Sequence, residues 1–395
     1  MKLFEYKKTS ELRVFKFFGM PIYQMIGNYR SSVRVQKFLG NLFVTERICD
    51  EILFHVEKVF KIFGFSFLKR IEDGILIKWY FFNFLFNTID LKKIFIKKYS
   101  KVFGKTNDCI FFLSSNSGEA YIFLTHVLDV ILKRYDAKKP LIVATKKYHV
   151  DLIKTICPEI PYRLVKPLKF QFKDDVLINE NQKYFLVFSQ QHFLQVLSDV
   201  KKRNVDYSHY YSAILSRCNV KYDDVAFRKV FISSSIENSM LSKIKDISLN
   251  LDNFVLICPG ALSAAGLSNS FWQDLVNKYK QQGIDVFVNL VGCSLDLSNV
   301  AYKTCYLTYS ELFSLATRAK RIVSLRSGLC EYLLQTGVPT YVLYSNFHYD
   351  RLTPQEGFKL FSMQKLKSYD KNNIFEFIVN SDELDILKEK ITNNL

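Results

Sequence analysis

The sequence predicts an α/β protein with two Rossmann-like lobes that face a cleft, preceded by a basic and mainly helical extension. Two series of short apolar runs, each alternating with segments of helical periodicity, predict two parallel sheets covered by helices. A length of 395 residues exceeds one ordinary hydrophobic core and suits two domains. We place the extension at residues 1–105, the first lobe at 106–245, the second lobe at 246–350 and a C-terminal helical tail at 351–395.

The composition is that of a folded protein from a reducing compartment. Hydrophobic residues make up 49% of the chain and charged residues 24%, which excludes a disordered chain. The eight cysteines include no C-x-x-C pair, so buried thiols are favoured over zinc ligands or disulfides. The N-terminus lacks the apolar core of a signal peptide, and the longest charge-free aromatic run, residues 79–89, covers about half the length of a membrane-spanning helix. We therefore expect a cytoplasmic protein.

Residues 1–105 carry most of the positive charge. The whole chain has a formal net charge of +17. This segment holds 20 Lys and Arg against 9 Asp and Glu, a net of +11, together with 23 of the 61 aromatic residues. Apolar positions three and four apart over residues 44–63 predict an amphipathic helix within it.

The interleaving of cations and aromatic rings in this segment suits contact with an anionic membrane surface, where both gain free energy. Nucleic acid is the rival partner. No helix-turn-helix spacing, zinc finger or RNP-type sequence occurs, so no nucleic-acid partner is expected. The remaining alternative is an ordinary Lys- and Phe-rich composition with solvated charges. The first interpretation places the protein at the inner membrane as a peripheral protein.

The first lobe begins with a βαβ pattern. Apolar runs at residues 109–113, 141–145 and 184–188 predict strands, and residues 119–134 and 150–156 predict helices. A polar turn that contains glycine joins the first strand to the first helix. Strand, turn, helix and strand in this order predict a parallel sheet.

The second lobe repeats the pattern with short connecting loops. The expected strands are residues 254–258, 285–290, 321–325 and 340–344, and the expected helices are residues 270–282, 310–320 and 328–335. The short loops imply a second doubly wound sheet. The tail ends in a predicted helix over residues 382–391.

The connection between strand 321–325 and the next helix is the first candidate site. Unpaired backbone N–H groups at a helix start favour anions, so Ser327, Gly328 and Leu329 would hold a diphosphate. Gly328 would allow a close approach, Arg326 would add a charge-assisted contact, and Glu331 would reach a ribose hydroxyl. The alternative is a plain Ser-Gly helix cap with an acidic first-turn residue and no ligand.

The loop after strand 254–258 is the second candidate, with Pro259, Gly260 and Ser263 as donor-binding residues. It also lies between a strand and a helix of the second lobe. Two such loops from one sheet converge on a ligand at a topological switch point. An ordinary Pro-Gly turn is the alternative.

Glu119 is the third candidate, at the predicted start of the first-lobe helix. A carboxylate that faces the cleft from this position would take a proton from an acceptor hydroxyl. The alternative is an acid that only favours the first turn of its helix.

Several motifs together carry a family resemblance. They are Pro259-Gly260-Ala261 after a strand, Trp272 in the next helix, residues 311–316, 324–328 and 337–339, and Gly118-Glu119 in the first lobe. The set resembles the GT-B glycosyltransferases and is similar to the ADP-heptose:lipopolysaccharide heptosyltransferase family and related bacterial capsule or lipopolysaccharide transferases. The resemblance covers about the last two-thirds of the chain. Glu119 stands where that family carries Asp, and Arg326 stands where it carries the Asp of Asp-Thr/Ser-Gly.

The resemblance implies an enzyme that moves a sugar from a nucleotide-activated donor to a growing surface glycan. Glu119 would deprotonate the acceptor while helix N-termini and Arg326 stabilise the departing diphosphate, with inversion at the anomeric carbon. No Asp-x-Asp triplet occurs, so we expect no metal and no cofactor other than the nucleotide-sugar substrate. Two alternatives stay open: a non-catalytic, membrane-docked scaffold of glycan assembly, and a sugar-phosphate or polyol-phosphate transferase.

Overall fold

The structure is a computed structural model of the chain, and it contains two compact units that are described separately. The first unit comprises Met1–Phe111 and Pro167–Lys202, and the second comprises Phe112–Lys166 and Arg203–Leu395. The residues that the structure describes are 4–8, 12–17, 20–26, 33–39, 42–50, 55–62, 65–73, 76–82, 84–103, 106–113, 116–166, 176–179, 182–187, 210–225, 227–293, 295–348, 352–366 and 370–393.

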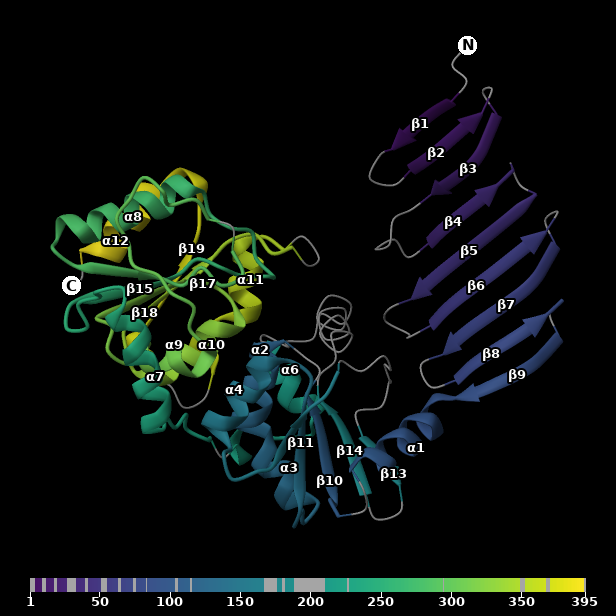
Figure 1. Ribbon diagram of the computed structural model, residues 1–395, viewed down its shortest axis with the longest axis horizontal. Coiled ribbons are helices and arrows are strands. Elements are labelled where there is room, and N and C mark those ends of the chain that lie inside the picture. The colour runs from purple at the N-terminus through teal and green to yellow at the C-terminus, as the bar shows by residue number, and fades with distance from the viewer. Residues whose placement is uncertain are drawn as a thin grey trace. The chain divides into compact units, whose positions relative to one another are not determined.

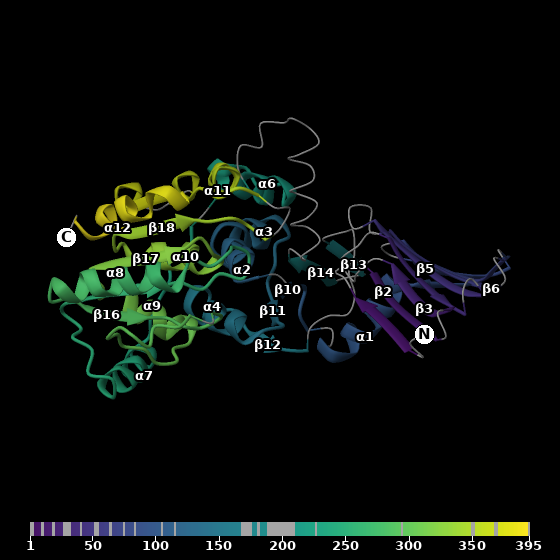
Figure 2. The same ribbon diagram turned by 90° about the horizontal axis from the view of Figure 1, so that it is seen from above.

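The first unit contains a nine-stranded antiparallel sheet in which each strand pairs with the next one along the chain. Its strands are β1 (Phe4–Lys8), β2 (Leu12–Phe17), β3 (Met20–Ile26), β4 (Val33–Phe38), β5 (Phe43–Asp50), β6 (His55–Ile62), β7 (Phe65–Asp73), β8 (Leu76–Phe81) and β9 (Phe84–Asp90). Figure 1 shows them side by side in sequence order, and Figure 2 shows them as a single layer. Helix α1 (Leu91–Phe103) follows β9 directly.

The prediction of a mainly helical extension is therefore wrong. Residues 44–63 were expected as an amphipathic helix, but residues 44–50 lie in β5 and residues 55–62 form β6, and the two strands pair antiparallel from Phe43 with Ile62. Residues 51–54 and 63 lie outside the described residues. Valine, isoleucine and phenylalanine are frequent in this stretch, and these residues favour strands. The register places Val44 and Val59 on one face and Phe60 on the other. Because both faces carry apolar residues, the alternation typical of a strand is lost and a helical period fits the sequence equally well.

The first unit also contains an antiparallel hairpin of β13 (Val176–Asn179) and β14 (Gln182–Val187). The N–H of Lys183 donates to the carbonyl of Asp108, 2.9 Å away, just before β10 (Cys109–Leu113). The strand expected at residues 184–188 is thus present as β14. Phe188 and the helical stretch expected after it lie outside the described residues.

The helices of the first lobe lie in the second unit. The helix expected over residues 119–134 consists of α2 (Ser117–Ile122), a π-helical turn (Phe123–Val127) and α3 (Leu128–Arg134). Strands β11 (Pro140–Ala144) and β12 (Tyr162–Leu164) pair in parallel and are connected by α4 (Lys147–Ile156). Two further helices are α6 (Tyr210–Arg217) and α7 (Ser234–Lys245). The β11–α4–β12 unit is parallel, as expected for the sheet of this lobe, although β12 was not among the expected strands.

The second lobe is a five-stranded parallel sheet with the strand order β16-β15-β17-β18-β19. Its elements are β15 (Phe254–Cys258), α8 (Asn269–Gln281), β16 (Asp285–Val288), α9 (Tyr309–Ala316), β17 (Arg321–Leu325), α10 (Gly328–Leu333), β18 (Thr340–Tyr344), α11 (Pro354–Phe361), β19 (Ile374–Ile378) and α12 (Leu384–Thr392). Figure 1 shows α8 and α12 on one face and α9 and α10 on the other. The doubly wound, Rossmann-like sheet predicted here is confirmed.

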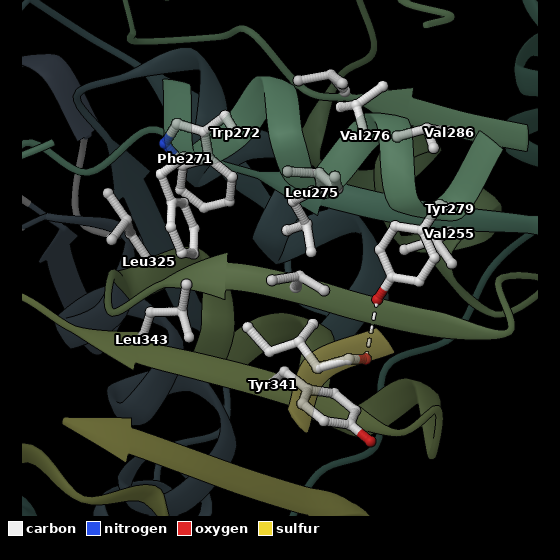
Figure 3. Close-up of a cluster of buried hydrophobic side chains, with 14 of the residues drawn as sticks. Val255, Phe271, Trp272, Leu275, Val276, Tyr279, Val286, Leu325, Tyr341 and Leu343 are labelled. Atoms are coloured by element: carbon white, nitrogen blue, oxygen red, sulfur yellow. Dashed lines mark hydrogen bonds between the residues drawn. The ribbon is translucent and has the colours of Figure 1, made fainter. Parts of the chain in front are cut away.

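The core between the sheet and α8 explains why this lobe forms. Phe271, Trp272, Leu275 and Tyr279 recur three and four residues apart, so one stripe of α8 is apolar and is fully buried on the sheet (Figure 3). The Tyr279 hydroxyl donates to the carbonyl of Ile391 in α12, 3.2 Å away, which satisfies the buried polar group.

The C-terminal segment is not a separate helical tail. The expected final helix is present as α12, but its Leu387 and Ile391 belong to the core of the second lobe. β19 pairs in parallel with β18 from end to end. This edge strand has Glu376 at its centre, and most of its residues are only partly buried. Among the described residues, no helix has the length and apolar character needed to cross a bilayer.

Candidate active site

The strand order of the second lobe creates a topological switch point between β15 and β17. After β15 the chain forms the edge strand β16, and it then returns to form β17 on the opposite side of β15. Ligands of open α/β sheets bind outside the carboxyl ends of the strands at such a point. The two segments predicted to bind the donor, the loop after β15 and the start of α10 after β17, both leave the sheet at this edge.

The loop after β15 is fixed by backbone contacts on two sides. A Cβ atom at Gly260 would lie 3.0 Å from the carbonyl oxygen of Val291, so glycine allows the loop after β16 to approach. The N–H of His348 donates to the carbonyl of Ser263 (2.9 Å), which ties the loop to the segment after β18. Pro259 is buried and Ser263 is half-buried. The loop therefore has a defined shape at the switch point.

Ser327 and Leu329 flank Gly328 at the start of α10. The Ser327 side chain makes no capping hydrogen bond to this helix, which argues against the interpretation of Ser327 as a plain helix cap. Leu329 is buried, so only its backbone N–H is available for the predicted role.

Gly328 and Gly118 allow two helix starts to cross. A Cβ atom at Gly328 would lie 2.5 Å from the backbone nitrogen of Gly118 and 2.8 Å from its Cα. A Cβ atom at Gly118 would overlap with Oε2 of Glu331. The start of α2 in the first lobe thus touches α10 in the second. The backbone of Gly118 makes the close approach to Gly328. Binding of a phosphate by Gly328 stays a prediction.

Arg326 and Glu331 form a buried ion pair with Tyr211. Nη2 of Arg326 donates to Oε1 of Glu331 (2.7 Å) and to the hydroxyl of Tyr211 (2.6 Å), and that hydroxyl donates to the same carboxylate oxygen. Both charged residues are at most 5% exposed. Burial raises the pKa of Glu331, and the positive charge of Arg326 opposes this shift. Both residues therefore have partners within the protein, and their predicted contacts with a diphosphate and a ribose stay predictions.

Glu119 lies in the first turn of α2 and is half-buried. The Tyr210 hydroxyl donates to its Oε1, 2.8 Å away. Burial raises the pKa of Tyr210 and the negative charge of Glu119 raises it further, so this hydroxyl stays a donor. Burial lowers the pKa of Lys146, which follows β11, and the charge of Glu119 opposes that shift. A carboxylate oriented in this way is suited to general-base chemistry.

The side chains that hold the two acids were not predicted from the sequence. Tyr210 and Tyr211, neighbours at the start of α6, donate to Glu119 and Glu331 respectively. The hydroxyl of Tyr309 in α9 donates to the Ser117 side chain at the start of α2, 3.0 Å away. No motif marks these tyrosines in a chain that has 23 of them. Only the fold brings them to the site.

Among the described residues, no group of three or more His, Cys, Asp or Glu side chains could hold a metal ion. The buried cysteines of the described residues are free thiols, as expected. They are Cys109, Cys157, Cys258 and Cys330. Burial raises the pKa of Cys109 to about 11 and that of Cys157 to about 12, which keeps both protonated. A reaction without a metal stays a prediction.

No family model and no curated protein matches the chain. Among solved structures, a glycosyl transferase family 9 protein from Veillonella parvula has a TM-score of 0.44 at 10% identity, covering 72% of this chain and 91% of that one. E. coli ADP-heptose LPS heptosyltransferase II has a TM-score of 0.43 at 11% identity, covering 72% and 96%. The iron-containing dodecameric glycosyltransferase TibC from enterotoxigenic E. coli has a TM-score of 0.39 at 12% identity, covering 77% and 70%.

These structures include the heptosyltransferases that the sequence resemblance names. With identities and TM-scores this low, the likeness says nothing about the donor, the acceptor or the catalytic residues of this chain.

Proposed function

We propose that this protein is a glycosyltransferase that moves a sugar from a nucleotide-activated donor to a growing surface glycan, either a lipopolysaccharide, a lipooligosaccharide or a capsule. The observation that carries the proposal is the switch point of the second lobe, where both segments predicted to bind the donor leave the sheet. Glu119 follows Gly118, whose backbone touches the start of α10. The donor site and the proposed base therefore belong to neighbouring helix starts.

On the donor side, the diphosphate lies against the backbone N–H groups at the start of α10 and against the loop after β15. Because Gly118 already occupies the space beside Gly328, a diphosphate at that position requires the start of α2 to move away. The buried positive charge of Arg326, partly offset by Glu331, supports the negative charge of the leaving group.

On the acceptor side, Glu119 takes the proton of a sugar hydroxyl while that oxygen attacks the anomeric carbon. The bond from this carbon to the diphosphate oxygen breaks, and the configuration inverts. Tyr210 orients the carboxylate through its hydrogen bond. The protein itself neutralises the leaving group, so the reaction needs no metal.

The net charge of +11 in residues 1–105 supports a peripheral position on the cytoplasmic face of the inner membrane, with an anionic membrane surface as a further partner. The alternatives are a non-catalytic scaffold of glycan assembly and a sugar-phosphate or polyol-phosphate transferase, which the fold accommodates equally well.

Isothermal titration with ADP, UDP, GDP, CDP and CMP tests the proposal. Saturable binding of one nucleotide is expected, and it identifies the donor class. Absence of binding across the panel would contradict the proposal and favour the scaffold. If only CDP binds, turnover of CDP-activated sugars against CDP-activated polyols separates sugar transfer from polyol-phosphate transfer.

Glu119→Gln tests the mechanism. It keeps the size and hydrogen bonding of the side chain but removes the base, so turnover should fall about 10²- to 10⁴-fold with little change in donor affinity. Glu237→Gln is the matched control, since Glu237 also lies in the first turn of a helix, α7, and it should leave turnover unchanged. A folded Glu119→Gln protein with near-normal turnover would remove Glu119 from the mechanism.

A further inference from the structure

The hydrogen bond that orients Glu119 is supported by the second lobe on both sides. Its two partners, Glu119 in α2 and Tyr210 in α6, both come from the first lobe. The chain neighbour of Glu119 is Gly118, where a Cβ atom would overlap with Oε2 of Glu331. The chain neighbour of Tyr210 is Tyr211, whose hydroxyl donates to Oε1 of Glu331. One carboxylate of α10 therefore touches the residue next to each partner of this hydrogen bond.

The Glu331 carboxylate is itself held by several contacts. Nη2 of Arg326 donates to Oε1 of Glu331 (2.7 Å) and to the Tyr211 hydroxyl (2.6 Å). Nε of Arg326 donates to the carbonyl of Phe361 at the end of α11, 3.2 Å away. Glu331 and Tyr211 are 2% exposed, and Arg326 is 5% exposed. A buried ion pair with these hydrogen bonds has little freedom to move, because another arrangement would leave a buried charge without a partner.

Phe361 also supports Tyr210 directly. The two rings pack edge to face with centroids 5.2 Å apart, and the guanidinium of Arg326 lies over the Phe361 ring, 5.6 Å from its centroid. The rings of Tyr210 and Tyr211 lie 5.8 Å apart. The position of the Tyr210 hydroxyl therefore depends on α10 and α11 of the second lobe as well as on α6.

The same contacts enclose Glu331. Gly118, Tyr211 and Arg326 surround its carboxylate oxygens, so a ribose hydroxyl would have to displace one of these groups to reach them. Burial raises the pKa of Glu331, the charge of Arg326 opposes this shift, and the negative charge of Glu119 adds to it. The two carboxylates are thus close enough to interact with each other.

We propose that Glu331 and Tyr211 are positioning residues for Glu119 and do not bind the ribose of the donor. They fix Gly118 and the start of α6, and they thereby fix both partners of the hydrogen bond between Glu119 and Tyr210. The carboxylate of Glu119 then meets the acceptor hydroxyl in one geometry, as a general base requires. The inference rests on the proposed function, in which Glu119 is the general base.

Tyr211→Phe tests the inference, because it removes only the hydroxyl that contacts both Arg326 and Glu331. Turnover at saturating donor should fall about 10- to 100-fold, since a misplaced base loses its productive geometry. ADP, UDP, GDP, CDP and CMP are titrated against both proteins, and the dissociation constant of the nucleotide that binds should change less than about twofold. Tyr279→Phe is the matched control. It removes another buried tyrosine hydroxyl, which donates to the carbonyl of Ile391, and it should leave turnover and nucleotide affinity unchanged.

The same substitution in a Glu119→Gln background separates positioning from a general loss of structure. Once the base is absent, Tyr211→Phe should lower turnover by less than about twofold further. Glu331→Gln should give the same pattern, with lower turnover, unchanged nucleotide affinity and no further loss in the Glu119→Gln background. Melting curves verify folding, and Tyr211→Phe, which keeps the ion pair of Arg326, tests the inference even if Glu331→Gln does not fold.

Failure of this inference differs from failure of the proposed function. If Tyr211→Phe weakens nucleotide binding and leaves turnover unchanged, the donor contacts this network and Glu331 binds the ribose. If Tyr211→Phe lowers turnover equally in the parent and in the Glu119→Gln background, it does not act through the base. Glu119 keeps its role in both cases. If Glu119→Gln alone has normal turnover, or if none of the nucleotides binds, the proposed function is wrong and this inference is wrong with it.

Discussion

In the second lobe, β15, β17 and β18 are buried at every position, whereas in the nine-stranded sheet the buried residues among those described are Val14, Val44 and Val59. Side chains packed on both faces stabilise the parallel sheet. Removal of one of these side chains should therefore lower the free energy of unfolding strongly. The antiparallel sheet depends on backbone hydrogen bonds and on cross-strand pairs worth about 0.2–1 kcal/mol each. The same kind of substitution should therefore have very different costs in the two regions.

Trp272→Ala gives the largest contrast. Removal of this fully buried side chain from the core of α8 should lower the free energy of unfolding of the second lobe by about 3–5 kcal/mol. Phe60→Ala, at a half-buried position of β6, should cost about 1 kcal/mol. Hydrogen exchange on peptides from each region, measured as a function of urea, reports both values. Equal costs would remove the distinction between the two sheets.

The second prediction concerns a single methyl group. Gly328→Ala should lower the free energy of unfolding by about 1–3 kcal/mol, because the new Cβ would meet the backbone of Gly118. Gly266→Ala is the control, since a Cβ atom there would have no heavy atom within 4 Å. It should be neutral or stabilise by up to about 1 kcal/mol. Thermal melts decide the question, and a Gly328→Ala protein as stable as the parent would show that the two helix starts do not touch.

This contact also changes how substitutions at Gly328 must be interpreted. A bulky residue at position 328 would also hold a phosphate away from the backbone N–H groups. Because the Cβ would displace Gly118, weaker nucleotide binding by Gly328→Val would follow from a shifted α2 as readily as from a blocked phosphate. The nucleotide panel and Glu119→Gln avoid this ambiguity, since neither adds volume at the crossing.

The difference in burial between the two sheets also explains which strands could be predicted from the sequence. The bounds of β15, β17 and β18 agree with the expected strands, because strands buried on both faces are mostly apolar, although β17 also contains Arg321 and Ser324. The nine-stranded sheet was predicted as helical because its half-buried strands carry apolar residues on both faces. β19 was missed because it is a short, mostly half-buried edge strand with a charged residue, Glu376, at its centre.

At the candidate site, the sequence indicated the segments and not their partners. The close approach predicted at Gly328 was to a phosphate, and in the structure the backbone of Gly118 lies in that space. The tyrosines of α6 act on Glu119 and Glu331 across about 90 and 120 positions of the chain. Such contacts depend on how two lobes pack, which local periodicity does not encode.

The smallest effect on stability is expected for the ion pairs of the nine-stranded sheet. Their coupling free energy reports whether this face of the sheet is exposed to solvent. Nζ of Lys61 lies 2.8 Å from Oε2 of Glu46, with side chains that are 28% and 29% exposed. A double-mutant cycle with Lys61→Gln and Glu46→Gln should give a coupling below about 1 kcal/mol that decreases further as salt is added, because water and ions screen the pair. In a corresponding cycle on Arg326 and Glu331, whose side chains are 6% and 3% exposed, the coupling should not change with salt. A large, salt-insensitive coupling between Lys61 and Glu46 would mean that this face of the sheet is covered, and it would then be a second packed core and not an open surface.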